Sequence, residues 1–201
     1  MGRALTNFEV NIDRVHHLGG LYDAICRITT PAVDCSDILR SQIVLAVSAL
    51  DYFFHEIVLE GMVDIYTGKR KPTPAYKRYN VSLELLLSES SGLDPVRFES
   101  VIREKLSYMT FQQPDKISEA IKLFSDRPIW SLVSTHMALQ KTIIKETLRL
   151  IVQRRNKIAH EADIDPSYPG LRWPISVPIV RHTVEFIDKL CKSVDSIVAI
   201  S

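Results

Sequence analysis

Apolar residues recur every three or four positions along most of the chain, a spacing that places them on one face of an α-helix. The pattern predicts long helices over residues 7–28, 37–66, 139–162 and 180–199, and shorter ones over 82–88, 94–110 and 114–125. Gly19 and Gly20 inside the first helix predict either a bend or a close approach of another helix. No alternating run bounded by Asn-Gly or Asp-Gly predicts a hairpin. We therefore expect one all-α domain, a helical bundle over residues 1–201.

The stretch 42–62 is apolar enough to resemble a membrane span. Its interior, however, contains Asp51, Glu56 and Glu60, and carboxylates are costly in hydrocarbon. We therefore interpret it as the core helix of a soluble, cytoplasmic protein without a membrane partner.

Composition restricts the chemistry further. The 201 residues carry a formal net charge of +1, so no global field attracts nucleic acid or membrane, and any anion must be held by a local cluster. Cys26, Cys35 and Cys191 show no metal-ligand spacing and are expected to be buried spectator thiols. No metal site and no cofactor are predicted, because metal-binding and phosphate-loop motifs are missing from the sequence.

The segment "RRNKIAHE" ends the helix predicted over 139–162. Arg155 occupies a vacant position in an apolar stripe, where a guanidinium is expensive unless a carboxylate or phosphate meets it. Asn156 and His160 share a face, whereas Arg155 and His160 lie roughly 140° apart around the axis. Cations also suit helix C-termini for structural reasons alone, which is the alternative. The stripe consists of Ile144, Leu148, Ile151, Ile158 and Ala162.

The second helix offers a counterpart to Arg155. Ser41, Ser48, Asp51 and His55 form a narrow polar stripe on an otherwise apolar helix. A direct contact between Asp51 and Arg155 would satisfy both charges. The alternatives are a plain structural ion pair, a solvent-facing strip, or two unconnected motifs.

These residues carry a family resemblance. "RRNKIAHE" at the end of a long helix resembles the R-x4-6-H signature of the HEPN superfamily, and "VSALDYFFHEI" resembles its early polar-in-apolar helix, most of all in the RiboL-PSP-HEPN group. The resemblance implies a dimerising helical bundle with metal-independent RNA endonuclease activity, used as a toxin or antiviral effector. By position it implies Arg155, Asn156 and His160 as catalytic residues, with Asp51 as an acidic helper.

The divergence of Arg155 and His160 on one helix, together with the family pattern, favours a homodimer in which two such helix ends line one cleft. Histidine can serve as base or acid for the ribose 2′-OH, and arginine can hold the phosphate. We also expect an inhibitory partner protein. The alternatives are a non-catalytic helical module that binds RNA or protein, or the regulatory half of a toxin–antitoxin pair.

The segment "GKRKPTPAYKRYN" combines cations with tyrosines, a composition suited to single-stranded RNA. The alternative is a solvated loop that caps the second helix. The candidate RNA-binding residues are Lys69, Arg70, Lys71, Lys77 and Arg78.

Overall fold

The computed structural model describes residues 2–81, 94–168 and 170–199. Apart from an isolated bridge between Ile164 and Arg172, the regular structure in these residues is helical, so the all-α prediction is confirmed. The helix predicted over 82–88 lies outside the described residues. The described helices are α1 (Arg3–Ile28), α2 (Ser36–Tyr66), α3 (Pro74–Lys77), α5 (Pro95–Ser107), α6 (Pro114–Ile121), α7 (Ile129–Met137), α8 (Lys141–His160) and α9 (Val177–Ala199).

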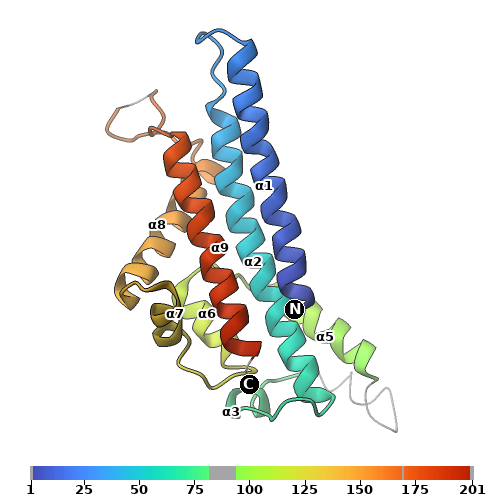
Figure 1. The fold of residues 1–201 in the computed structure, drawn as a ribbon. Coiled ribbons are helices and arrows are strands. Elements are labelled where there is room, and N and C mark those ends of the chain that lie inside the picture. Colours follow the sequence, from blue (N-terminus) through green and yellow to red (C-terminus); the bar gives the residue numbers. More distant parts are fainter. Residues whose placement is uncertain (1, 82–93, 169, 200–201) are drawn as a thin grey trace.

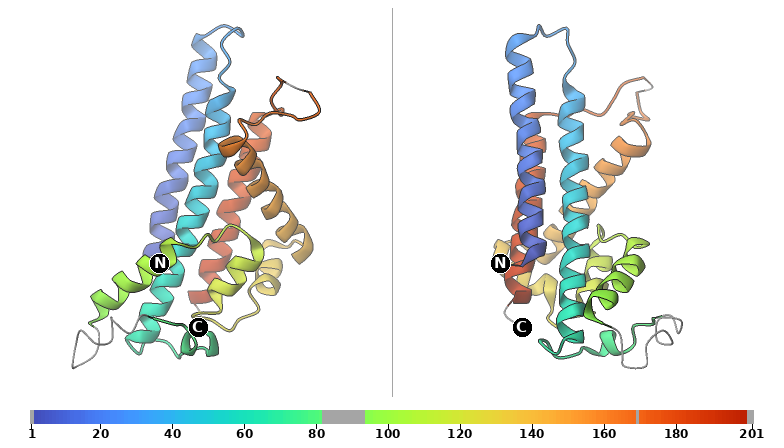
Figure 2. Two further views of the ribbon diagram at one scale, coloured as in Figure 1. Left: turned by 180° about the vertical axis from the view of Figure 1, so that it is seen from behind. Right: turned by 90° about the vertical axis from the view of Figure 1, so that its right-hand side faces the viewer.

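The centre of the fold is α2. It forms a long antiparallel hairpin with α1, and α9 packs alongside (Figure 1). Helix α8 crosses α2 obliquely and packs on it. The shorter helices α3, α5, α6 and α7 lie toward the end of the hairpin where α1 begins and α2 ends (Figure 2). The candidate residues on α2 and α8 are therefore brought together by one helix crossing.

Burial accounts for the apolar composition of α2. By length and composition it could cross a membrane, but 67% of its most apolar window is buried inside the protein. Phe53 packs edge-on against Phe8 of α1, with ring centroids 5.5 Å apart, and against Phe54 at 5.3 Å. These contacts agree with a core helix of a soluble protein.

A buried carboxylate on α2 is neutralised from two other helices. Glu56 is only 2% exposed, and Arg103 of α5 donates hydrogen bonds to both of its carboxylate oxygens. Arg3 Nε of α1 lies 3.8 Å from Glu56 Oε2. The hydrogen bond to Glu56 is the main cause that raises the pKa of Arg103, so the guanidinium stays charged. The ion pairs thus fasten α1, α2 and α5 together.

Helix boundaries differ from the sequence prediction around α8. The helix begins at Lys141 and ends at His160, so Leu139 and Ala162 lie outside it. Ala138 at the end of α7 and Ala162 after α8 adopt left-handed backbone conformations, with φ of 52° and 51°, which stop a right-handed helix. Ala162 is exposed and does not belong to the apolar stripe.

Two short helices, α3 and α7, were not predicted as helices. Helix α3 starts at a proline, and α7 starts just after one. Proline is tolerated in the first turn of a helix, but in a sequence it usually indicates a loop. On α7, Trp130 is buried, and its Nε1 donates to the Pro114 carbonyl at 3.1 Å.

Two smaller expectations concern glycine and cysteine. A Cβ on Gly19 would lie 3.2 Å from Gln42 Oε1 on α2, which supports the close-approach interpretation. Cys191 is buried as expected, but Cys26 is exposed and Cys35 half-buried, so that expectation was wrong for these two.

Gly61 is the tightest packing point on α2. A Cβ there would lie 2.2 Å from Cγ of the buried Phe124 ring, so we expect Gly61→Ala to lower the free energy of unfolding by about 1–3 kcal/mol. Gly20→Ala is the matched control, because nothing lies within 4 Å and alanine favours a helix by about 0.5–1 kcal/mol. Urea denaturation of both variants measures the difference. Equal effects would refute the packing argument.

Candidate active site

Arg155 and Asp51 are connected through a third side chain, Gln112, in the loop between α5 and α6. The half-buried Arg155 guanidinium donates to Gln112 Oε1, and Gln112 Nε2 donates to Asp51 Oδ2 at 3.0 Å. Only this amide orientation serves both partners, because the guanidinium is purely a donor and the ionised carboxylate purely an acceptor. The expected direct contact is therefore replaced by an amide bridge.

The Asp51 carboxylate is held firmly on its own side of this bridge. Its Oδ1 accepts the Phe111 backbone N–H at 2.6 Å and lies 3.9 Å from His55 Nε2. The His55 ring in turn packs on the Phe111 ring, with centroids 4.6 Å apart. The polar stripe on α2 thus has two parts, because Ser41 and Ser48 face solvent whereas Asp51 and His55 are covered by the loop at 111–112.

His160 lies on another side of α8. The helix remains regular to its end, where Glu161 N–H donates to the Lys157 carbonyl at 3.0 Å, so the last turn does not fray. An ideal helix then separates Arg155 and His160 by roughly 140° and about 7.5 Å along the axis. Asn156 is half-buried and His160 is exposed. The two side chains therefore leave α8 in different directions.

The turn after α8 sends a carboxylate back into the protein. Ala162 and Asp163 are both left-handed, with φ of 51° and 58°, and the Asp163 N–H returns to the Lys157 carbonyl at 3.0 Å. Aspartate tolerates this conformation better than most residues. As a result, the Asp163 side chain is fully buried beneath the end of α8.

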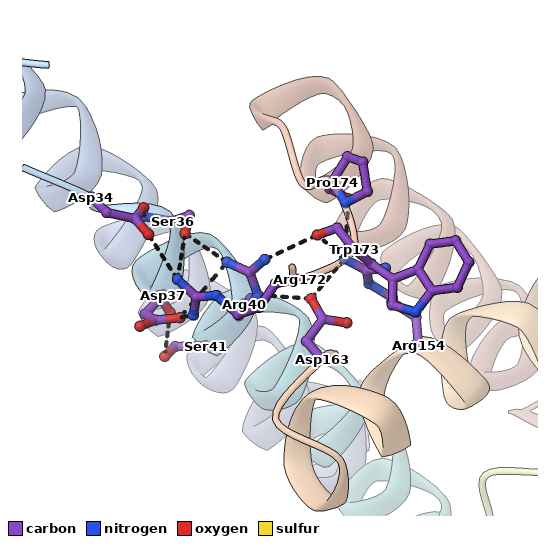
Figure 3. A network of polar contacts seen from close by, with 10 residues as sticks. All are labelled: Asp34, Ser36, Asp37, Arg40, Ser41, Arg154, Asp163, Arg172, Trp173 and Pro174. Atoms are coloured by element: carbon purple, nitrogen blue, oxygen red, sulfur yellow. Dashed lines mark hydrogen bonds and ion pairs between the residues drawn. The ribbon is translucent and has the colours of Figure 1, made fainter. Parts of the chain in front are cut away.

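Asp163 receives two arginines from different helices, as Figure 3 shows. Its Oδ2 accepts hydrogen bonds from Arg40 Nε on α2 at 2.7 Å and from Arg154 on α8 at 2.8 Å. Both guanidiniums also donate to the Trp173 carbonyl, at 3.0 and 3.1 Å. Burial lowers the pKa of Arg154, and Asp163 opposes this shift. We call Arg40, Arg154 and Asp163 the arginine clasp.

The segment that follows α8 is fixed at its surface as well. Arg172 pairs with Asp34 at 2.7 Å, just before α2, and with Asp37 in the first turn of α2 (Figure 3). Lys157 Nζ lies over the Trp173 ring, 4.9 Å from its centroid. The clasp and these contacts position the last two turns of α8, which carry Arg155, Asn156 and His160, relative to α2.

The basic loop lies at the other end of α2. Arg70 is half-buried, donates twice to the Val198 carbonyl of α9 at 3.2 Å, and lies over the Phe124 ring, so it serves the fold. Lys69 is exposed and 3.9 Å from Asp64. Lys71, Lys77 and Arg78 are exposed. RNA binding by this loop stays a prediction, carried by the exposed cations.

Among the described residues, no three His, Cys, Asp or Glu side chains gather into a group that could hold a metal ion. The chemistry around Arg155 is that of a guanidinium, an amide and a carboxylate, which suits binding and orienting an anion.

The family model described as RiboL-PSP-HEPN matches residues 10–199 of the chain. The chain belongs to the RiboL-PSP-HEPN family. This confirms the resemblance that "RRNKIAHE" suggested, and the match spans α2 and α8 together with the loop that joins them through Gln112. No curated protein and no solved structure matches the chain significantly.

In this HEPN chain, sequence reasoning missed Gln112 and the arginine clasp. Gln112 belongs to no periodic element, so only the fold reveals it. Arg40 did leave a signal, because it is the only lysine or arginine in α2 and a cation on a core helix requires an anion.

The arginine clasp generates a stability prediction. Asp163→Asn removes the buried carboxylate that two largely buried arginines share, so we expect the free energy of unfolding to fall by about 3–5 kcal/mol. Asp37→Asn is the control, because that carboxylate is 72% exposed and its ion pairs are worth less than about 1 kcal/mol. Chemical denaturation compares the two. Similar losses in both variants would show that the clasp contributes no more than a surface pair.

Proposed function

We propose that this HEPN protein is a metal-independent RNA endonuclease, with Arg155, Asn156 and His160 as its catalytic residues. The observation that carries the proposal is the amide bridge from Asp51 through Gln112 to Arg155, which gives a half-buried guanidinium a fixed anionic support beside the family motif. An arginine that served only to stabilise the C-terminus of α8 would not need such support.

The proposed reaction proceeds by attack of the ribose 2′-oxygen. A neutral histidine takes the 2′-OH proton, the 2′-oxygen bonds to phosphorus, and the bond from phosphorus to the 5′-oxygen breaks. A protonated histidine returns a proton to the leaving 5′-oxygen. The products are a 2′,3′-cyclic phosphate and a 5′-OH, and DNA, which lacks the 2′-OH, is not cut.

Arg155 binds the non-bridging phosphate oxygens and stabilises the charge that develops on them. Asp51 and Gln112 act as positioning residues, because they hold Arg155 and do not themselves touch the phosphate. Asn156, one turn before His160, orients the imidazole or binds a phosphate oxygen.

We further propose that two copies of the chain complete each site. The divergence of Arg155 and His160 within one α8 requires a second α8 for the two groups to meet. Two adjoining hollows share Leu45 of α2: one of 430 Å³ between α1 and α2, and one of 530 Å³ that reaches Ile158 and Ala162 at the end of α8. This face exposes Val10, Leu45 and Tyr52, apolar side chains that a symmetric partner would cover.

A cytoplasmic toxin or antiviral role, restrained by an inhibitory partner protein, follows from the same proposal, since an unrestrained ribonuclease would damage its host. Under this proposal, the unit that acts is the whole chain, residues 1–201.

The divergence of Arg155 and His160 also favours a second candidate function, a helical module that binds RNA or protein without cutting. In that case the bridge from Asp51 to Arg155 would serve only to bind an anion. Replacement of His160 would then leave the binding of RNA or protein unchanged. Neither the wild-type protein nor any variant would cut RNA.

The first test is incubation of purified protein with total RNA, with and without EDTA, followed by mapping of the new ends. We expect cyclic phosphate ends in both conditions, and a roughly 10²–10⁴-fold slower reaction for His160→Ala and Arg155→Ala. His136→Ala, which replaces an exposed histidine on α7, is the matched control and should cut normally. Cleavage that EDTA abolishes, or that His160→Ala retains, would contradict the mechanism.

The dimer proposal is tested with Leu45→Arg. Leu45 is 42% exposed on the proposed face, so a buried arginine there should convert a dimer into a monomer in light scattering and reduce cleavage to the level of His160→Ala. Ile143→Arg replaces a similarly exposed residue, at 48%, near the start of α8, and should change neither property. A strictly monomeric wild-type protein that still cuts RNA would refute the requirement for two copies.

A further inference from the structure

A small aromatic cavity lies between the end of α2, α3 and α5, away from the arginine clasp. It has a volume of about 200 Å³ and is lined by Met62, Tyr66, Tyr76, Tyr79, Phe98 and Ile102. This volume is below the roughly 300–1,000 Å³ typical of pockets for drug-sized ligands, so it suits a single ring system. The cavity therefore fits one flat group and not a whole nucleotide.

The walls of the cavity offer flat surfaces and one unused polar group. Tyr66 and Phe98 stack with ring centroids 4.1 Å apart and planes at 6°. The Tyr79 hydroxyl is buried and has no hydrogen-bond partner among the residues that the structure describes. Burial raises the pKa of Tyr79, so the phenol keeps its proton and can donate. Because buried polar groups are normally satisfied, this hydroxyl is a donor that an acceptor atom of a ligand in the cavity could use.

The rim of the cavity is cationic. The exposed Lys77 and Arg78 lie in the chain between Tyr76 and Tyr79, which both line the cavity. Lys105 Nζ of α5 lies 4.7 Å from the centroid of the Tyr79 ring. Positive charge next to aromatic faces complements a ligand that has both an apolar ring and a neighbouring phosphate. A hydrophobic peptide side chain would make no use of these cations.

We infer that this cavity binds one unpaired nucleobase of a single-stranded RNA, stacked on the tyrosines and accepting a hydrogen bond from Tyr79. The adjacent cations hold the flanking phosphates. The inference rests on the proposed function in that the RNA is the same strand that Arg155 and His160 act on.

The position of the cavity determines how this subsite would act on the substrate. Asp51 and Tyr66 lie on α2 within roughly 60° around the helix axis and about 22 Å apart along it. A bound strand must therefore place several nucleotides between the held base and the scissile bond. The subsite would select substrates with an unpaired base at a fixed distance from the cut.

The test uses single-stranded oligoribonucleotides that carry one 2-aminopurine at successive positions. The full-length protein carries His160→Ala so that the RNA stays intact. Stacking quenches 2-aminopurine fluorescence, so we expect quenching at one position, lost in Tyr79→Ala and Tyr66→Ala together with a roughly 5- to 150-fold weaker affinity. Tyr79→Phe should keep the quenching but weaken binding, because it removes only the hydroxyl.

Tyr168→Ala is the matched control, because Tyr168 is exposed in the segment after α8 and does not line the cavity. It should bind and quench as the parent does, and circular dichroism verifies that every variant folds. RNA that binds without position-dependent quenching, or equally to all variants, overturns the base subsite but leaves the nuclease proposal standing. A protein that binds no RNA overturns both, and would leave the cavity to a protein partner.

Discussion

One buried carboxylate, that of Asp163, accepts hydrogen bonds from guanidinium groups on two helices far apart in the sequence, Arg40 of α2 and Arg154 of α8. Because Arg154 directly precedes Arg155, this contact fixes the rotation of the last turns of α8 relative to α2. The amide bridge from Arg155 to Asp51 is possible only at that rotation. The geometry of the candidate site thus depends on three charged groups, none of which is a proposed catalytic residue.

Glu56 and Asp51, two carboxylates on α2, are held by different kinds of hydrogen-bond donor. Glu56 is an acid in the core, and arginines from α1 and α5 neutralise it. Asp51 is less buried and receives neutral donors, a backbone N–H and the Gln112 amide. A carboxylate held by neutral donors is not already paired with an arginine, so it can support a nearby cation. Glu56 therefore holds helices together, whereas Asp51 can assist Arg155.

The long helices were predictable because α1, α8 and α9 each bury a stripe at helical spacing, and because α2 is a long apolar run. The family motif likewise identified Arg155, Asn156 and His160 as a group. Gln112 and Asp163 could not be predicted, because one lies in a loop and the other depends on two left-handed residues in succession. Such positions are set by the closing of the whole chain, and no local pattern encodes them.

The α1–α2 hairpin extends beyond the body of the protein (Figure 1), and none of the residues 16–38 is buried. A segment without buried apolar contacts opens with little free energy, whereas the core half of α2 opens only when the whole protein unfolds. Backbone amides at the hairpin tip should therefore exchange with solvent deuterium far sooner than those around Asp51. The molecule combines a pliable tip with a rigid centre along the same two helices.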